Sequence, residues 1–249
     1  MRRCATAILA AVLALLVCRP AAAREDALAV DLTRHLITIA TDFTGTSEVV
    51  FGALDGPGDV VVVVRGPPRE VTVRRKQRIA RIWVNTEAMT FAGVPGFYFV
   101  AASRPLAEIA DSATRAVNRL GLDHLHLEAE RAAPPEEIEP FAAALVRTQQ
   151  RFGLFPRTTG KVQFIGERLF RTTVALPATV PTGSYRVETF LFRGGTIVAR
   201  QTIPLVISKT GLGASVFDFA TQQPALYGAI AVAVAMVAGW LASLPFKGI

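Results

Sequence analysis

The sequence predicts a mainly β chain with an α-helical insert, immunoglobulin-like β-sandwich regions and one C-terminal transmembrane helix. Short runs of β-branched and aromatic residues, separated by turn residues, occur both before and after a middle segment. In that middle segment, residues 104–155, the apolar residues recur at helical spacing instead. Near the C-terminus, residues 226–244 carry no charge at all.

The first β region, residues 24–103, reads as an N-terminal β-sandwich-like domain. Clusters of glycine and proline separate its strands, and short strands at intervals of roughly ten residues favour a sandwich over alternating strands and helices. The uninterrupted valine run at 60–64 predicts a central strand covered on both faces. The expected strands are residues 35–40, 48–53, 59–64, 70–74, 79–84 and 97–100.

The helical module, residues 104–155, is expected to contain two helices. The first has apolar residues at helical spacing from Leu106 to Leu120, with Gly121 as its terminator. The second begins at Pro134 and Pro135, has acidic residues in its first turn, and ends at Gly153.

A second β-sandwich-like region is expected over residues 156–209. Its predicted strands are residues 161–165, 169–176, 184–192 and 196–207, with Gly194 and Gly195 forming a hairpin turn. They resemble the later strands of an immunoglobulin-like sandwich. The sequence leaves open whether the two β regions form one sandwich or two.

The two ends of the chain predict its topology. Arg2 and Arg3, an apolar stretch at 5–17 and the small residues 21–23 indicate a cleaved signal peptide over residues 1–23. After a tether at 210–224, residues 225–244 would span a bilayer, because their uncharged part reaches about 29 Å at 1.5 Å per residue. Residues 245–249 would be a cytoplasmic tail. We therefore expect a single-pass protein of the bacterial inner membrane with its main domain in the periplasm.

The cysteine content and net charge of the chain limit the disulfides and the partners that can be expected. Both cysteines, Cys4 and Cys18, lie in the segment expected to be removed, so the exported domain should have no disulfide. The net charge of +7 falls to about +4 once Arg2, Arg3 and Arg19 leave with the signal. This mild charge argues against a nucleic-acid partner. The oligomeric state is not predicted.

A basic run in the first β region is the main candidate binding site. Cationic side chains concentrated in this way bind anionic groups or an acidic partner. The alternative is structural: the arginines keep a strand edge soluble and unpaired. The candidate residues are Arg65, Arg69, Arg74, Arg75, Lys76, Arg78 and Arg81.

A metal site is the sharpest enzymatic candidate. On a strand, His124, His126 and Glu128 would share one face and could hold zinc or another transition metal. The alternative is a solvated polar face with the intervening leucines turned inward. Because the chain has no recognisable hydrolase, phosphate-loop or thiol motif, we expect no catalytic residue and no cofactor.

Small residues on the predicted membrane helix form a third candidate surface. Gly228, Ala231, Ala235 and Gly239 repeat at helical spacing, which would let another helix approach closely. The same pattern can also arise because alanine is abundant throughout the chain.

Eight short motifs are distributed over nearly the whole chain after the signal. They are Phe43–Thr46, Val50–Ala53, Val62–Pro67, Arg74–Lys76, Ile82–Asn85, Pro95–Tyr98, Leu226–Gly228 and Gly239–Trp240. Together they resemble the Alph_Pro_TM family of alphaproteobacterial transmembrane proteins. The resemblance implies an accessory role near a transporter, since members tend to be encoded beside sulfite-exporter-like permeases, and it carries no catalytic residue onto this sequence.

The leading hypothesis is a non-enzymatic, membrane-anchored periplasmic accessory protein that associates with an integral-membrane partner such as a permease. A periplasmic binding module that takes a small anion through residues 65–81 is the alternative. A metal-dependent enzyme that uses residues 124–128 is the third hypothesis.

Overall fold

The structure is a computed structural model that describes residues 27–79, 81–209 and 219–243. The predicted signal peptide (1–23) and cytoplasmic tail (245–249) lie outside these residues, as does most of the predicted tether (210–224).

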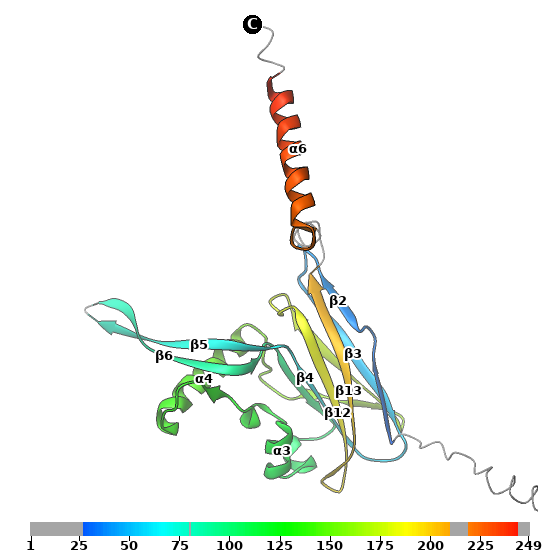
Figure 1. Cartoon of the computed structure of the whole chain (residues 1–249). Helices are drawn as coiled ribbons and strands as arrows, with labels where there is room; N and C mark the ends of the chain where they lie inside the picture. The colour runs from blue at the N-terminus through cyan, green and yellow to red at the C-terminus, as the bar shows by residue number, and fades with distance from the viewer. Residues whose placement is uncertain (1–26, 80, 210–218, 244–249) are drawn as a thin grey trace, which may run out of the picture.

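The chain is mainly β, as predicted, and its strands form three sheets (Figure 1). The four-stranded sheet has the order β1 (Leu28–Leu32), β3 (Gly45–Leu54), β11 (Leu169–Pro177) and β10 (Gln163–Ile165). The six-stranded sheet has the order β2 (Leu36–Ile39), β13 (Thr196–Lys209), β12 (Gly183–Arg193), β4 (Asp59–Arg65), β7 (Tyr98–Ala102) and β9 (Gly160–Lys161). The third sheet contains β5 (Pro68–Ile79), β6 (Ile82–Pro95) and β8 (Glu128–Ala129).

Strands from before and after the helical module are hydrogen-bonded neighbours in both larger sheets. In the four-stranded sheet, β3 pairs antiparallel with β11 from Gly45 opposite Pro177 to Ala53 opposite Leu169. In the six-stranded sheet, β4 pairs antiparallel with β12. The two β regions therefore contribute to one shared sandwich, which answers the question that the sequence left open.

The valine run is the central strand of the six-stranded sheet. β4 lies between β12 and β7, and each residue from Val60 to Val64 is 0% exposed. Successive side chains of a strand point to opposite faces, so complete burial of all five valines requires cover on both faces. The prediction of a doubly covered strand is confirmed.

Helices lie between β7 and β9 in the chain, as α2 (Leu106–Ile109), α3 (Ser112–Asn118), the short 3-10 helix η1 (Leu122–His124) and α4 (Pro135–Arg151). The second predicted helix corresponds to α4. The first is divided in two, because the Asp111 side chain accepts a hydrogen bond of 2.8 Å from the Thr114 amide and begins a new helix. In Figure 1, α4 lies beside the hairpin of β5 and β6, and α3 lies near the lower end of β4.

A tyrosine fixes the entry into β12. The Tyr185 side chain is fully buried, and its hydroxyl donates a hydrogen bond to the carbonyl of Pro181, four residues earlier. Burial raises the pKa of this hydroxyl, so it remains a donor at any physiological pH. A buried tyrosine bonded to backbone a few residues upstream is a device found in immunoglobulin-like sandwiches.

The C-terminal helix α6 (Pro224–Ser243) stands apart from the sheets (Figure 1). The sequence analysis predicted that residues 225–244 cross a membrane. Among the described residues, however, no helix is long and apolar enough to do so. The predicted fold class is corrected here, because its transmembrane helix is not supported.

The close approach of β1, β3 and β11 generates a prediction at Gly52. A Cβ atom at this position would lie 2.4 Å from the Ala29 carbonyl oxygen and 2.6 Å from the Phe170 ring. We expect Gly52→Ala to lower the free energy of unfolding by about 2 kcal/mol, as overpacked cores do. Denaturant unfolding measures the loss. Gly56→Ala is the control, since its new Cβ would meet only the flexible end of Arg193 at 3.4 Å. Equal stability of the two variants would contradict the expectation.

Candidate functional site

The main candidate site is a two-stranded arm, residues 68–95, formed by β5 and β6. It projects from the sandwich as a long hairpin (Figure 1). The pairing of β4 with β7 ends at Arg65 opposite Tyr98, and that of β5 with β6 begins at Pro68 opposite Pro95. Residues 59–102 therefore form one continuous antiparallel ribbon whose inner half is core and whose outer half is the arm.

Two glycines allow the ribbon to continue out of the sandwich. The Gly66 amide donates to the Phe97 carbonyl, and the Gly96 amide donates to the Pro67 carbonyl, each at 2.8 Å. A Cβ at Gly66 would lie 2.8 Å from the Phe97 nitrogen and 2.9 Å from the Tyr185 ring. Glycine is therefore required where the ribbon leaves the sheet.

The base of the arm is anchored by apolar packing and one polar contact. Met89, Phe91 and Val94 of β6 are at most 2% exposed. On the neighbouring strand, an Arg69 Nη donates to the side-chain oxygen of Gln149 on α4, at 3.2 Å. Since Gln149 is itself buried, Arg69 satisfies a polar group that would otherwise be stranded in the core.

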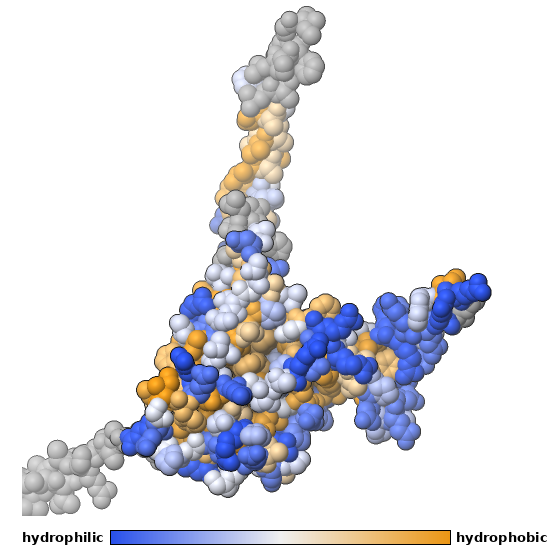
Figure 2. All heavy atoms as spheres, turned by 180° about the vertical axis from the view of Figure 1, so that it is seen from behind, coloured by the Kyte–Doolittle hydropathy of each residue, from blue (hydrophilic) through white to orange (hydrophobic). Residues whose placement is uncertain are grey.

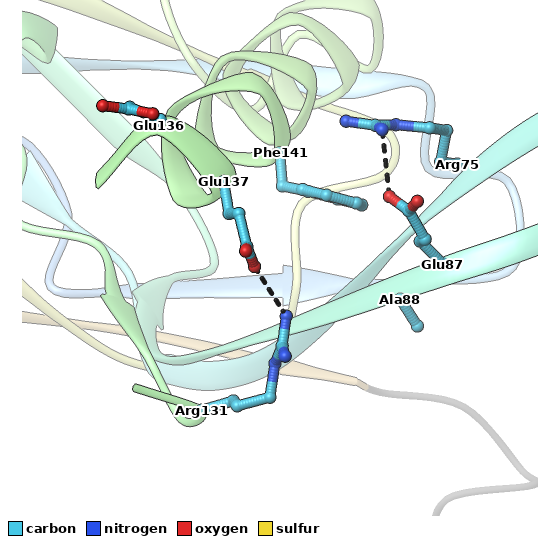
Figure 3. Close-up of a pocket in the computed structure, with 7 residues that line it drawn as sticks. All are labelled: Arg75, Glu87, Ala88, Arg131, Glu136, Glu137 and Phe141. Carbon is cyan, nitrogen blue, oxygen red and sulfur yellow. Dashed lines mark hydrogen bonds and ion pairs between the residues drawn. The ribbon is translucent and has the colours of Figure 1, made fainter. Parts of the chain in front are cut away.

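A second set of contacts holds the middle of the arm against the start of α4 (Figure 3). Arg75 pairs with Glu87 across the arm at 2.9 Å, and its guanidinium lies 5.0 Å from the centre of the Phe141 ring. Arg75, Glu87 and Phe141 line a hollow between the arm and the start of α4, which Figure 3 shows. On the other side of this hollow, Arg131 pairs with Glu137 at 3.2 Å. Both arginines of this hollow, Arg75 and Arg131, are paired with carboxylates. The contact of Arg75 with Phe141 holds the arm in position against α4.

Arg65 belongs to an ion cluster on the face of the six-stranded sheet that the end of α3 covers. It is paired with Glu188, which is also paired with Arg200. Arg65 also donates to the carbonyls of Asn118, at 2.8 Å, and Arg119, at 3.2 Å, at the end of α3. Burial lowers the pKa of Arg65 but leaves it charged, so it neutralises Glu188 and caps the negative end of a helix.

The structure thus divides the seven predicted basic residues into two groups. Arg65, Arg69 and Arg75 are held by internal contacts. The side chains of the other four, Arg74, Lys76, Arg78 and Arg81, are exposed and form no ion pair or side-chain hydrogen bond with any described residue.

Three of these four cations share one face of the arm. Arg74, Lys76 and Arg78 alternate along β5, so their side chains point to the same side in a row about 13 Å long. The arm's two acids, Glu70 and Glu87, lie at its base and in the ion pair with Arg75. We call Arg74, Lys76 and Arg78 the cationic row.

Apolar residues adjoin the cationic row at the outer end of the arm. Trp83 lies opposite Arg78 in the strand register, so both point to the same side. Ile82 and Trp83 are 67% and 66% exposed, and the end of the polar arm is partly orange in Figure 2. Sequence reasoning assigned these residues to a sandwich strand, although an apolar stretch directly after a basic run was a visible signal.

The candidate metal site is not a strand face. His124 ends η1, His126 follows in a loop, and Glu128 begins β8. The closest approach of His126 to Glu128 is 3.9 Å. Within the described ranges, no three histidine, cysteine or acidic side chains are grouped closely enough to hold a metal ion. The expected alternation failed because Gly121, at a φ of 99°, turns the chain into a helix.

The small-residue face of α6 is open. A Cβ added at Gly228 or Gly239 would meet no atom within 4 Å. Packing of another helix against Gly228, Ala231, Ala235 and Gly239 stays a prediction.

Comparison with known protein families gives one match. The model of a family described as "Putative transmembrane protein (Alph_Pro_TM)" matches residues 27–248. The resemblance noted from the motifs is therefore confirmed, and the description names a class of membrane protein without an activity. No curated protein matches the chain.

The division of the basic residues predicts contrasting effects on stability. Arg65→Ala should lower the free energy of unfolding by about 3 kcal/mol, because it removes one partner of a buried carboxylate and of two helix carbonyls. Arg74→Ala should leave the free energy of unfolding nearly unchanged, because its side chain is exposed. Urea unfolding of the two variants measures the difference. Similar losses from both would show that the assigned division is incorrect.

Proposed function

This chain belongs to the Alph_Pro_TM family of transmembrane proteins, and on that premise we propose that it is a non-enzymatic interaction protein whose arm binds an acidic surface of a membrane partner. It would work at the bacterial inner membrane, with the sandwich in the periplasm. The partner would be an integral-membrane protein such as a permease.

The observation that carries this proposal is the cationic row. Arg74, Lys76 and Arg78 have no carboxylate partner among the described residues, although Arg75, on the opposite face of the same strand, is paired. Unneutralised cations aligned in a row attract an acidic surface, accelerate encounter and select against basic partners.

The apolar end of the arm supports a protein partner. Arginine and tryptophan are among the residues that contribute most to the binding free energy of protein interfaces, particularly where an aromatic anchor adjoins charged groups. Trp83 beside Arg78 provides such a combination and is two-thirds exposed in this structure. An anchor of this kind would bury apolar area that the cations alone cannot supply.

The rigidity of the arm also favours binding. Arg69 and Arg75 attach its base and middle to α4, so the row is held in place before a partner arrives. Preorganisation of this kind lowers the conformational entropy lost on association.

A row about 13 Å long suits an extended acidic surface better than one small anion. The hypothesis of a small-anion site required the basic side chains of residues 65–81 to converge on one point. Arg65 instead faces Glu188 inside the protein, and Arg69 and Arg75 are held against α4.

Charge reversal of the cationic row tests the proposal. The full-length protein would be recovered from its native membranes in mild detergent, and co-purifying membrane proteins quantified by mass spectrometry. For the triple variant Arg74→Glu, Lys76→Glu, Arg78→Glu we expect partner recovery to fall by at least about tenfold, because attraction becomes repulsion. Wild-type recovery should also fall as salt is raised, since exposed charges are screened.

A matched control carries the same charge change elsewhere. Arg147, Arg151 and Arg168 are exposed arginines outside the arm, and their reversal to glutamate should leave partner recovery near the wild-type level. An equal loss of partner recovery in both triple variants would show that recovery depends on the net charge of the protein and not on the cationic row. Failure of the wild type to recover any membrane protein beyond the tag-only background would refute the proposal.

A further inference from the structure

A second hollow lies in the helical module, between α3, η1 and the end of α4. It has a volume of about 370 Å³ and is lined by residues of α3, η1, α4 and the loop before β9. Such a volume is within the usual range for small-molecule sites. Its polar lining residues are Arg115, Asp123, His124, Gln150, Arg157, Thr158 and Thr159.

Arg115 is the unusual group in this hollow. Its Nε atom is buried and has no hydrogen-bond partner among the described residues, and no ion pair joins its guanidinium to a carboxylate. The Asp111 carboxylate accepts a hydrogen bond from the Thr114 amide at 2.8 Å and interacts electrostatically with Arg115, but the two side chains do not form an ion pair. A buried guanidinium nitrogen without a partner is costly. A carboxylate in the hollow would offset part of that cost by neutralising the charge of the same guanidinium.

The charges around the hollow indicate how many negative charges a ligand should carry. Arg115 and Arg157 contribute two positive charges and Asp123 one negative charge. The excess of one positive charge matches a monoanion. A multiply charged anion would meet repulsion from Asp123.

The remaining lining is apolar. Leu106, Leu120, Leu122 and Val146 line the hollow together with Val100 of β7, while the two threonines, Thr158 and Thr159, add hydroxyl donors. Gln150 is held in place, because its side-chain nitrogen donates to the Pro156 carbonyl at 3.1 Å. A ligand that fits this lining has one anionic group and a compact apolar body.

We propose that this hollow is a binding site for a small organic monocarboxylate. The carboxylate accepts hydrogen bonds from Arg115 and Arg157, and the apolar body lies on the leucines and Val146. The site is independent of the arm and goes beyond the interaction function proposed above.

Binding of benzoate and butyrate to the purified full-length protein tests this inference by calorimetry and thermal unfolding. We expect saturable binding and a rise in Tm for both carboxylates, and neither effect for benzyl alcohol or benzylamine, which lack the negative charge. Arg115→Gln should weaken benzoate binding by at least about tenfold, as expected for loss of a charged hydrogen bond. Arg147→Gln, an exposed arginine of α4 outside the hollow, should bind like the wild type.

Histidine NMR gives a readout that localises the ligand. The chain has three histidines, and His124 lines the hollow whereas His35 lies near β2. Bound benzoate should shift the His124 ring signals, because the ligand would lie beside this side chain. His35 should not respond.

Three outcomes would overturn the proposal. They are no binding of either carboxylate at about 10 mM, benzoate binding that survives in Arg115→Gln, or shifts at His35 without shifts at His124. If Arg115→Gln does not fold, the variant Arg157→Gln, at the exposed rim of the hollow, serves as the test instead. Undiminished benzoate binding by Arg157→Gln would show that the proposed site is wrong.

Discussion

The projecting part of this molecule depends on two backbone hydrogen bonds, from Gly66 to Phe97 and from Gly96 to Pro67. They continue the pairing of β4 with β7 directly into the pairing of β5 with β6, so the arm is an extension of a sheet. Its inner end includes β4, in which each residue from Val60 to Val64 is 0% exposed. A hairpin attached in this way has a defined direction, which a loop of equal length would lack.

Chemically similar side chains in the same basic run have opposite environments. Arg65 is enclosed by Glu188 and helix carbonyls, whereas Arg74 and Arg78 contact no carboxylate in the described part of the chain. The difference follows from position along the ribbon: the inner end is surrounded by the second sheet and the helices, and the outer end is surrounded by solvent. A buried guanidinium must be paired, while an exposed one is hydrated at little cost.

Local sequence signals predicted the elements well and their assembly poorly. The valine run, the start and end of α4 and the Gly194–Gly195 turn each depend on residues close in the chain, and the structure contains all three. The projecting hairpin of β5 and β6 was missed because residues 70–74 alternate polar and apolar side chains as a sandwich strand does, although residues 74–78 are all polar. The burial of Arg65 could not be foreseen, since its partner Glu188 lies in a strand beyond the helical module. Apolar composition likewise predicted a spanning helix that the described residues do not support.

The interleaving of early and late strands constrains how the protein is made. β3 has β1 and β11 as neighbours, and β4 has β7 and β12. The four-stranded sheet therefore lacks β11 until residue 177 has emerged, and the six-stranded sheet lacks β12 until residue 193 has emerged. The folding nucleus must join segments separated by more than a hundred residues, and such high contact order slows folding. Until then, the edges of β3 and β4 are exposed to intermolecular pairing. The nascent polypeptide therefore needs protection from aggregation throughout its synthesis.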